Sequence, residues 1–110
     1  MPNQTLLYHY KTSDIEVTIE AFLEEGSLRV EGYDIGKTVK EYWGDSDYEY
    51  SLTLTAENTI KLCEVLGVAP HDERALLLEL QRRFNSNTCY SDLQAFLEDR
   101  KISYEGFSWT

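Results

Sequence analysis

The stretch IEVTIEAFL, residues 15–23, alternates apolar and polar side chains almost without a break. Successive side chains of a strand point to opposite faces, so a period of two predicts a strand with one buried face and one exposed face. Glu16, Thr18 and Glu20 occupy the polar side. The apolar side is formed by Ile15, Val17, Ile19, Ala21 and Leu23.

Further strands are expected on both sides of this stretch. EEGS, residues 24–27, contains a glycine, and LRVEGYDIG, residues 28–36, follows it, which predicts a hairpin that turns near Gly26. TLLYHYK, residues 5–11, is apolar and aromatic and is typical of a strand. DYEYSLTLT, residues 47–55, alternates again. Its apolar side is formed by Tyr48, Tyr50, Leu52 and Leu54.

The period changes to that of a helix after residue 55. The spacing of Ile60, Cys63 and Leu66 predicts a first helix that ends at Gly67. DERALLLELQRRF, residues 72–84, predicts a second helix, because its acidic start and basic end suit the helix dipole. Its apolar stripe is formed by Leu76, Leu77, Leu80 and Phe84.

Three weaker signals complete the chain. Ser91 and Gln94 match a capping box and predict the start of a third helix, with Leu93, Phe96 and Leu97 on its buried side. KTVKEYW, residues 37–43, predicts a short helical turn, and KISYEGFSWT, residues 101–110, a short returning strand.

Strands followed by helices predict an α+β fold in a single domain spanning residues 1–110. We expect a mostly antiparallel sheet of about four strands in the N-terminal half, followed by about three helices packed on one face. The core should then unite Val17, Ile19, Leu52, Leu54, Leu77, Leu80 and Phe96.

The charge of the chain is strongly negative. It carries 20 acidic and 10 basic side chains, and the excess is concentrated in residues 1–66, where 13 acidic groups face 5 basic ones. Nucleic acid and anionic membranes require neutralising Lys or Arg, so this composition disfavours both as partners. It favours a basic protein partner, whose association it would accelerate.

The sequence predicts a cytoplasmic protein with free thiols at Cys63 and Cys89. No apolar run approaches the ~20 residues that cross a bilayer, and the N-terminus lacks the pattern of a signal peptide. Reducing conditions in the cytosol keep cysteines unpaired.

The acidic segment WGDSDYEY, residues 43–50, raises the question of a metal site or a catalytic site. Asp45, Asp47 and Glu49 begin like a calcium loop, but Tyr50 and Ala56 stand where that loop needs glycine and glutamate. The His and Cys residues lack zinc spacing, and the sequence contains neither a nucleophile elbow nor a phosphate loop. Either Cys63 or Cys89 could pair with His71 as nucleophile and base. Cys63 lies on the apolar stripe of a predicted helix, however, and a small buried core residue is the better explanation for it. We therefore predict neither a metal, a cofactor nor catalysis.

Two interpretations of this segment remain: it forms a binding surface, or it is the solvated face of a strand. Tyr and Trp are favoured at protein interfaces, and this chain is rich in both. The candidate partner-binding residues are Glu41, Tyr42, Trp43, Asp45, Asp47 and Glu49, with Glu16 and Glu20 as possible neighbours.

A small, acidic, tyrosine-rich α+β chain without catalytic residues resembles the immunity proteins that neutralise bacterial toxins. The resemblance covers size, charge and composition over the whole chain and includes no family-specific motif. It implies a basic toxin domain as the partner, with carboxylates in the place of the phosphates that a nuclease would bind.

Two other functions stay open from the sequence. A small-molecule sensor or enzyme would have its site between sheet and helices, where Tyr8, His9, Tyr10 and Tyr33 could line it. A homo-oligomeric domain is the third possibility.

Overall fold

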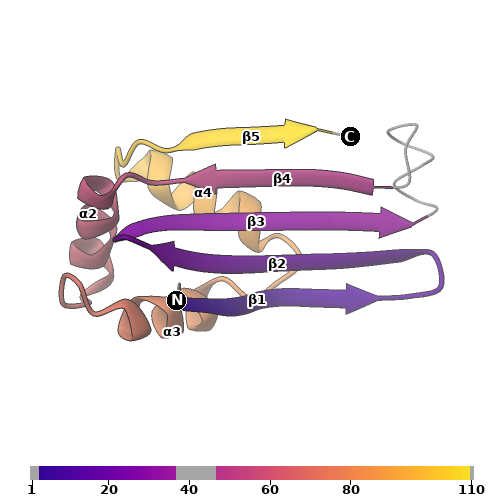
Figure 1. Cartoon of the computed structure of the whole chain (residues 1–110), viewed down its shortest axis with the longest axis horizontal. Helices are drawn as coiled ribbons and strands as arrows, with labels where there is room; N and C mark the ends of the chain where they lie inside the picture. Colours follow the sequence, from indigo (N-terminus) through magenta and orange to yellow (C-terminus); the bar gives the residue numbers. More distant parts are fainter. Residues whose placement is uncertain (1–2, 37–46, 110) are drawn as a thin grey trace.

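The computed structural model describes residues 3–36 and 47–109 (Figure 1). It confirms the predicted α+β fold, with an antiparallel sheet followed by helices. The predicted helical turn at 37–43 lies outside the described residues. The elements are β1 (Asn3–Lys11), β2 (Ile15–Glu24), β3 (Ser27–Gly36), β4 (Asp47–Thr53), α2 (Ala56–Leu66), α3 (Glu73–Arg83), α4 (Cys89–Asp99) and β5 (Glu105–Trp109).

The described strands form a five-stranded sheet in which each strand is hydrogen-bonded to its neighbours in the sequence, in the order β1-β2-β3-β4-β5. All neighbouring pairs are antiparallel. The returning strand expected near the C-terminus is present as β5, which pairs with β4 along one edge of the sheet (Figure 1).

The β2–β3 hairpin turns where the sequence predicts it. Glu24 pairs with Ser27, and the two residues between them, Glu25 and Gly26, have φ values of 53° and 81°. Positive φ at both central positions defines the tight turn whose twist matches that of the flanking strands. Glycine adopts this conformation without the steric cost that a side chain brings.

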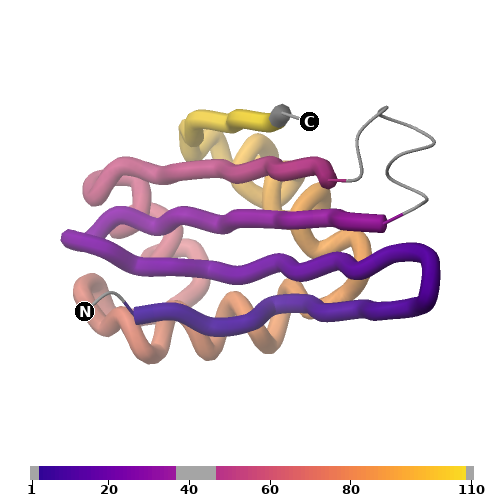
Figure 2. The backbone as a smooth tube through the Cα atoms, turned by 45° about the vertical axis from the view of Figure 1, so that its right-hand side comes forward, coloured from indigo at the N-terminus to yellow at the C-terminus, as the bar shows by residue number. Residues whose placement is uncertain are grey.

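The helices lie on one side of the sheet (Figure 1; Figure 2). Helices α3 and α4 run behind the strands, and α2 lies at the end of the sheet where the β2–β3 turn is found (Figure 1). Most of the sheet side chains that face them are apolar, and the strand period therefore decides which face is buried. None of the helices within the described residues is long and apolar enough to cross a membrane.

The core between sheet and helices matches most of the predicted set. Ile19, Leu52, Leu54, Leu77 and Leu80 are buried together. Two further members, Val17 and Phe96, are only partly buried and pack against this cluster. The rest of the buried cluster consists of Leu7, Ala21, Leu23, Leu28, Val30, Leu62, Cys63, Leu66, Leu76, Phe84, Cys89, Leu93, Leu97 and Ile102.

The ends of α2 and α3 follow the sequence signals. The Thr55 side chain accepts a hydrogen bond from the Asn58 amide at the start of α2, and Gly67 ends that helix with φ 74°. Asp72 caps α3 in the same way, accepting from the Ala75 amide at 3.1 Å. Side-chain oxygens at these positions satisfy amides that have no partner within the helix.

The predicted start of α4 is wrong by nearly one turn of helix, because the N-cap is Thr88 and not Ser91. The helix begins at Cys89, so Ser91 and Gln94 lie inside it rather than forming a capping box. Thr88 takes the capping position, but its hydroxyl donates to the Asp92 carboxylate at 2.9 Å instead of accepting from a backbone amide. A side chain–side chain bond of this kind leaves no signature in the spacing of capping residues.

The first prediction tests the core. Leu80→Ala should lower the free energy of unfolding by about 2–5 kcal/mol, because a fully buried leucine side chain is replaced by a cavity. Leu78→Ala on the same helix is the matched control, since Leu78 is 56% exposed and should cost little. Urea denaturation of both variants measures the difference, and equal losses would show that the helix does not bury the Leu80 side.

Candidate functional site

One face of the sheet is not covered by the described helices, and we call it the open face. The strand registers align one row of side chains across it from β1 to β5: Leu6, Glu20, Glu31, Ser51 and Phe107. The adjacent row of paired residues, which faces the helices, includes Ala21, Val30 and Leu52, which are fully buried. The two faces therefore differ in chemistry as the alternation in the sequence predicts.

The open face is acidic. Within residues 3–36 and 47–109, the basic side chains on the open face are Lys11 and Arg29. Its carboxylates belong to Glu16, Glu20, Glu24, Glu31, Asp47, Glu49 and Glu105.

Half of the predicted partner-binding residues can be placed. Glu16 and Glu20 lie on β2, and Asp47 and Glu49 lie on β4, all on the open face. Strand β3 separates the two pairs, so they are second neighbours across the sheet rather than adjacent. The other predicted residues, Glu41, Tyr42, Trp43 and Asp45, lie outside the described residues.

Some of these carboxylates are compensated by nearby donors. His9 Nε2 lies 2.8 Å from Glu16 Oε2, and this hydrogen bond holds the pKa of Glu16 below its usual value. The Tyr33 hydroxyl donates to Asp47 at 3.3 Å. Burial and the nearby Asp47 carboxylate raise the pKa of Tyr33, so its phenol stays neutral.

The carboxylates in the middle of the open face are only partly compensated. Glu20 and Glu31 are directly opposite each other on β2 and β3, an arrangement that destabilises a sheet through repulsion of like charges. Arg29 pairs with Glu31 at 2.7 Å. Within the part of the chain that the structure describes, Glu20 and Glu49 form no ion pair, so their charges are available to another molecule.

A shallow hollow of about 370 Å³ lies in the middle of the open face. Its lining includes Glu20, Glu31 and Glu49, the ring of Tyr33, and Arg29, which pairs with Glu31. Two exposed apolar side chains lie beside lining residues in the strand registers: Leu6, 45% exposed, is opposite Glu20, and Phe107, 62% exposed, is opposite Ser51. Acidic groups beside exposed aromatic surface are a combination suited to protein contact.

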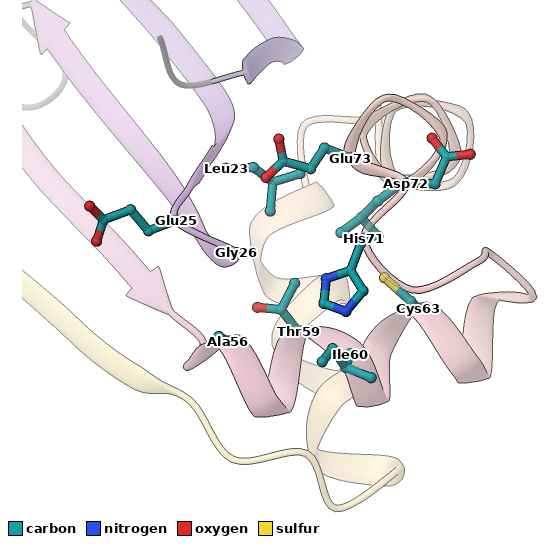
Figure 3. Close-up of a pocket in the computed structure, with 11 residues that line it drawn as sticks. Leu23, Glu25, Gly26, Ala56, Thr59, Ile60, Cys63, His71, Asp72 and Glu73 are labelled. Atoms are coloured by element: carbon teal, nitrogen blue, oxygen red, sulfur yellow. The ribbon is translucent and has the colours of Figure 1, made fainter.

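A second pocket, of about 280 Å³, brings Cys63 and His71 together between α2 and the start of α3 (Figure 3). The His71 side chain points toward α2, beside Cys63 and Thr59 (Figure 3). Burial raises the pKa of the Cys63 thiol, which is the opposite of what a nucleophilic cysteine requires.

The nearby carboxylates are already engaged in structural contacts. Asp72 caps α3, and Glu73 accepts a hydrogen bond from Asn3 at 2.7 Å. The described side chains include no hydrogen bond between Cys63 and His71, and His71 is not among the groups that shift the pKa of Cys63. The described residues also contain no group of three or more His, Cys, Asp or Glu placed to hold a metal ion.

The four residues suggested as lining for a small-molecule site do not share one place. Tyr8 is partly buried on the helix side of β1, and Tyr10 on the same side is 48% exposed. His9 and Tyr33 lie on the open face. A site lined by all four is therefore not formed.

A different set of tyrosines gathers between sheet and helices, and we call Tyr48, Tyr50 and Tyr90 the tyrosine cluster. The rings of Tyr50 and Tyr90 meet edge to face, with centroids 4.8 Å apart, and the Tyr48 ring lies 5.3 Å from Tyr50. The Tyr50 hydroxyl donates to Asp34 Oδ1 at 2.9 Å. Sequence alternation placed Tyr48 and Tyr50 on the helix side, but nothing in it linked them to Tyr90 or Asp34.

Gly32 makes the cluster possible. It lies opposite Tyr50 on β3, and a Cβ atom at this position would lie 1.9 Å from the Tyr50 ring. The ring therefore occupies the space that a side chain on β3 would fill, and its bond to Asp34 and contact with Tyr90 hold it there. The sequence pattern places Gly32 within a strand and contains no sign of this contact.

Burial changes the ionisation of these groups. Desolvation raises the pKa of Asp34, although the hydrogen bond from Tyr50 partly opposes this effect. Desolvation also raises the pKa of Tyr50, and that of Tyr90 to about 12. The phenols are consequently neutral at physiological pH, and Asp34 carries a charge that its surroundings disfavour.

No protein family model, curated protein or solved structure matches this chain. Its described residues nevertheless present two arrangements with a defined chemistry. One is the acidic open face, and the other is the tyrosine cluster with Asp34 on the opposite side of the sheet.

The second prediction concerns Gly32. Gly32→Ala should destabilise the protein by about 1–3 kcal/mol, because the added methyl group displaces the Tyr50 ring from its contacts. Gly106→Ala is the matched control in a neighbouring part of the sheet, where the nearest atom would be 3.9 Å away. Thermal unfolding distinguishes them, and an unchanged Tm for Gly32→Ala would show that the ring can leave at little cost.

The third prediction concerns Asp34. The pKa of Asp34 in the folded protein is raised, which means that folding disfavours the charged carboxylate. The charge therefore lowers the free energy of unfolding, in full once the pH exceeds the pKa values of both the unfolded and the folded state. Asp34→Asn keeps an acceptor for the Tyr50 hydroxyl and should therefore raise Tm at pH 7. The gain should vanish below about pH 4, where the wild-type carboxyl is protonated in both states.

Asp14→Asn in the exposed β1–β2 turn is the matched control and should leave Tm unchanged at both pH values. A lower Tm for Asp34→Asn at pH 7 would mean that the charged carboxylate stabilises the fold.

Proposed function

We propose that this protein is a non-catalytic binding module that uses the open face to bind a basic protein partner. The observation that carries the proposal is the uncovered sheet face itself, on which carboxylates greatly outnumber Lys and Arg. An antiparallel sheet needs cover on one face only, so the other face is available for contact.

The chemistry of the open face supports a protein as the partner. Glu20 and Glu49 have no ion pair within the described residues, and Tyr33 and Phe107 add exposed aromatic area near them. Carboxylates of this kind steer a positively charged partner and select against other surfaces, while aromatic groups contribute area at the contact. Nucleic acid would meet repulsion here, since its phosphates carry the same sign of charge.

A second copy of the chain is a poorer occupant of the same surface. Two open faces would bring their carboxylates together, and each chain carries a net charge of -10. Like charges held close across an interface cost several kcal/mol. Electrostatics therefore favours a different, basic chain.

The function that fits these properties is that of a cytoplasmic immunity-type inhibitor. A toxin domain that binds nucleic acid presents a basic cleft, and a rigid sheet that displays carboxylates can occupy the positions of the phosphates. Such a role needs shape and charge but no reacting group, in keeping with the neutral thiol of Cys63.

The fourth prediction tests this proposal through charge. Replacing Glu20, Asp47 and Glu49 by Gln, Asn and Gln should slow association with the partner and remove most of its salt dependence, because these charges act on the encounter. These carboxylates are half-buried and form no ion pair among the described residues, so Tm should stay close to the wild-type value.

The matched control changes the same net charge elsewhere, with Glu57→Gln, Glu64→Gln and Asp99→Asn on α2 and α4. Immobilised wild type, open-face variant and control are exposed in parallel to lysate of the native host, and retained proteins are identified and then purified for kinetic measurement. A basic protein retained by wild type and control but not by the open-face variant supports the proposal. Equal retention by all three proteins would contradict it.

A further inference from the structure

The tyrosine cluster borders a pocket of about 480 Å³ on the helix side of the sheet. Residues of β3 and β4 form its floor, and α4 with the segment before it forms a wall. This volume lies in the range that small ligands occupy. The residues that matter for its chemistry are Asp34, Tyr48, Tyr50, Asn87, Tyr90 and Gln94.

The charge of the lining restricts the kind of ligand. Among the described residues that line the pocket, Asp34 carries the acidic side chain, and none is Lys, Arg or His. Asn87 and Gln94 add neutral amides. An anion would find no opposite charge here and would be repelled by Asp34, so the pocket suits a cation or a neutral molecule.

The aromatic rings favour the cation. The planes of Tyr50 and Tyr90 meet at 74°, and that of Tyr48 is inclined by 38° to Tyr50. All three rings line the pocket, so aromatic surface and the Asp34 carboxylate border the same space. The face of an aromatic ring is electronegative and attracts an organic cation, most strongly where water is excluded.

Asp34 supplies a counter-charge at the same place. One of its oxygens accepts the hydrogen bond from Tyr50, and no ion pair to Asp34 occurs among the described residues. Its pKa is raised because burial disfavours the carboxylate. A cation in the pocket would relieve that cost, which makes its binding and the ionisation of Asp34 mutually favourable.

We propose that this pocket binds an organic cation of the alkylated ammonium type, with the tyrosine cluster as its aromatic walls and Asp34 as its counter-charge. The site lies on the side of the sheet opposite to the open face. Tyr50 also lines the hollow of the open face and Phe107 belongs to that face, but Asp34 and Tyr90 line this pocket and not the hollow. The proposed site does not depend on the function proposed for the open face.

The test is an NMR titration of the full chain with choline, followed through the tyrosine ring resonances. 3,3-Dimethyl-1-butanol has nearly the same shape as choline without the charge and serves as the neutral comparison. Choline should produce saturable shifts of the cluster rings at millimolar concentration, and the neutral analogue should bind at least about tenfold more weakly. The cation could be a free metabolite or a protein side chain, so N-acetyl-trimethyllysine amide is titrated in parallel. Tighter binding of choline indicates a free metabolite, and tighter binding of the lysine derivative indicates a side chain.

Variants locate the site. Asp34→Asn should weaken choline binding about tenfold, and Tyr90→Leu should weaken it severalfold, whereas Tyr90→Phe should retain most of it because the ring is kept. Glu64→Gln, an exposed carboxylate on α2, is the matched charge control and should bind choline as wild type does. Far-ultraviolet circular dichroism and Tm show which variants are folded, and Tyr90→Phe with Asp34→Asn keeps the test decisive if Tyr90→Leu unfolds.

Equal binding of choline and its neutral analogue would overturn the proposal, as would the absence of saturable shifts. It would also fail if folded Asp34→Asn bound choline as tightly as wild type. Because Asp34 is not on the open face, loss of choline binding without loss of the protein partner separates this site from the proposed function.

Discussion

Burial of one side of the sheet under α3 and α4 is the interaction on which the rest of the structure depends. Ile19, Leu52 and Leu80 are fully enclosed between the two layers, and each contributes apolar area that water no longer contacts. The helices can supply cover only because their leucines recur on one side. Once this side is buried, the period of two in each strand commits every other residue to the opposite side.

That commitment explains why acidic residues gather where they do. Glu16 and Glu20 alternate with Val17 and Ile19 along β2, and Asp47 and Glu49 continue the same phase on β4. A core built from alternating strands therefore produces a charged surface as its direct counterpart. The helix side of the sheet is not uniformly apolar either, since Asp34 and the tyrosine cluster lie where β3 and β4 extend past the leucine core.

Local patterns predicted much of this fold. The alternation of residues 15–23, the turn at Gly26 and the leucine stripe of the second helix each depend on neighbours within a few positions, and the structure confirms them. The start of α4 was missed because its Thr88 bonds to a side chain instead of an amide.

The tyrosine cluster was missed for a different reason. It depends on the register that places Gly32 against Tyr50, and on a helix remote in sequence that brings Tyr90 to them. No period or spacing encodes such contacts. For the open face, the alternation along each strand was predictable but the order of the strands was not. The sequence could therefore assign Glu20 and Glu49 to the exposed side of their strands, but it could not predict how far apart they lie in the sheet.

The position of β5 has a consequence for the order in which the chain folds. No described helix lies between consecutive strands from β1 to β4. Strands β4 and β5, by contrast, are separated in sequence by α2, α3 and α4. Closing so long a loop costs more chain entropy than closing a hairpin, so the last strand is expected to join a sheet that already exists. Gly106 and Ser108 of β5 border the pocket beside the tyrosine cluster, which is therefore complete only when that strand has docked. A molecule that bound only the complete pocket would stabilise the docked C-terminal strand, since a ligand favours the state that binds it.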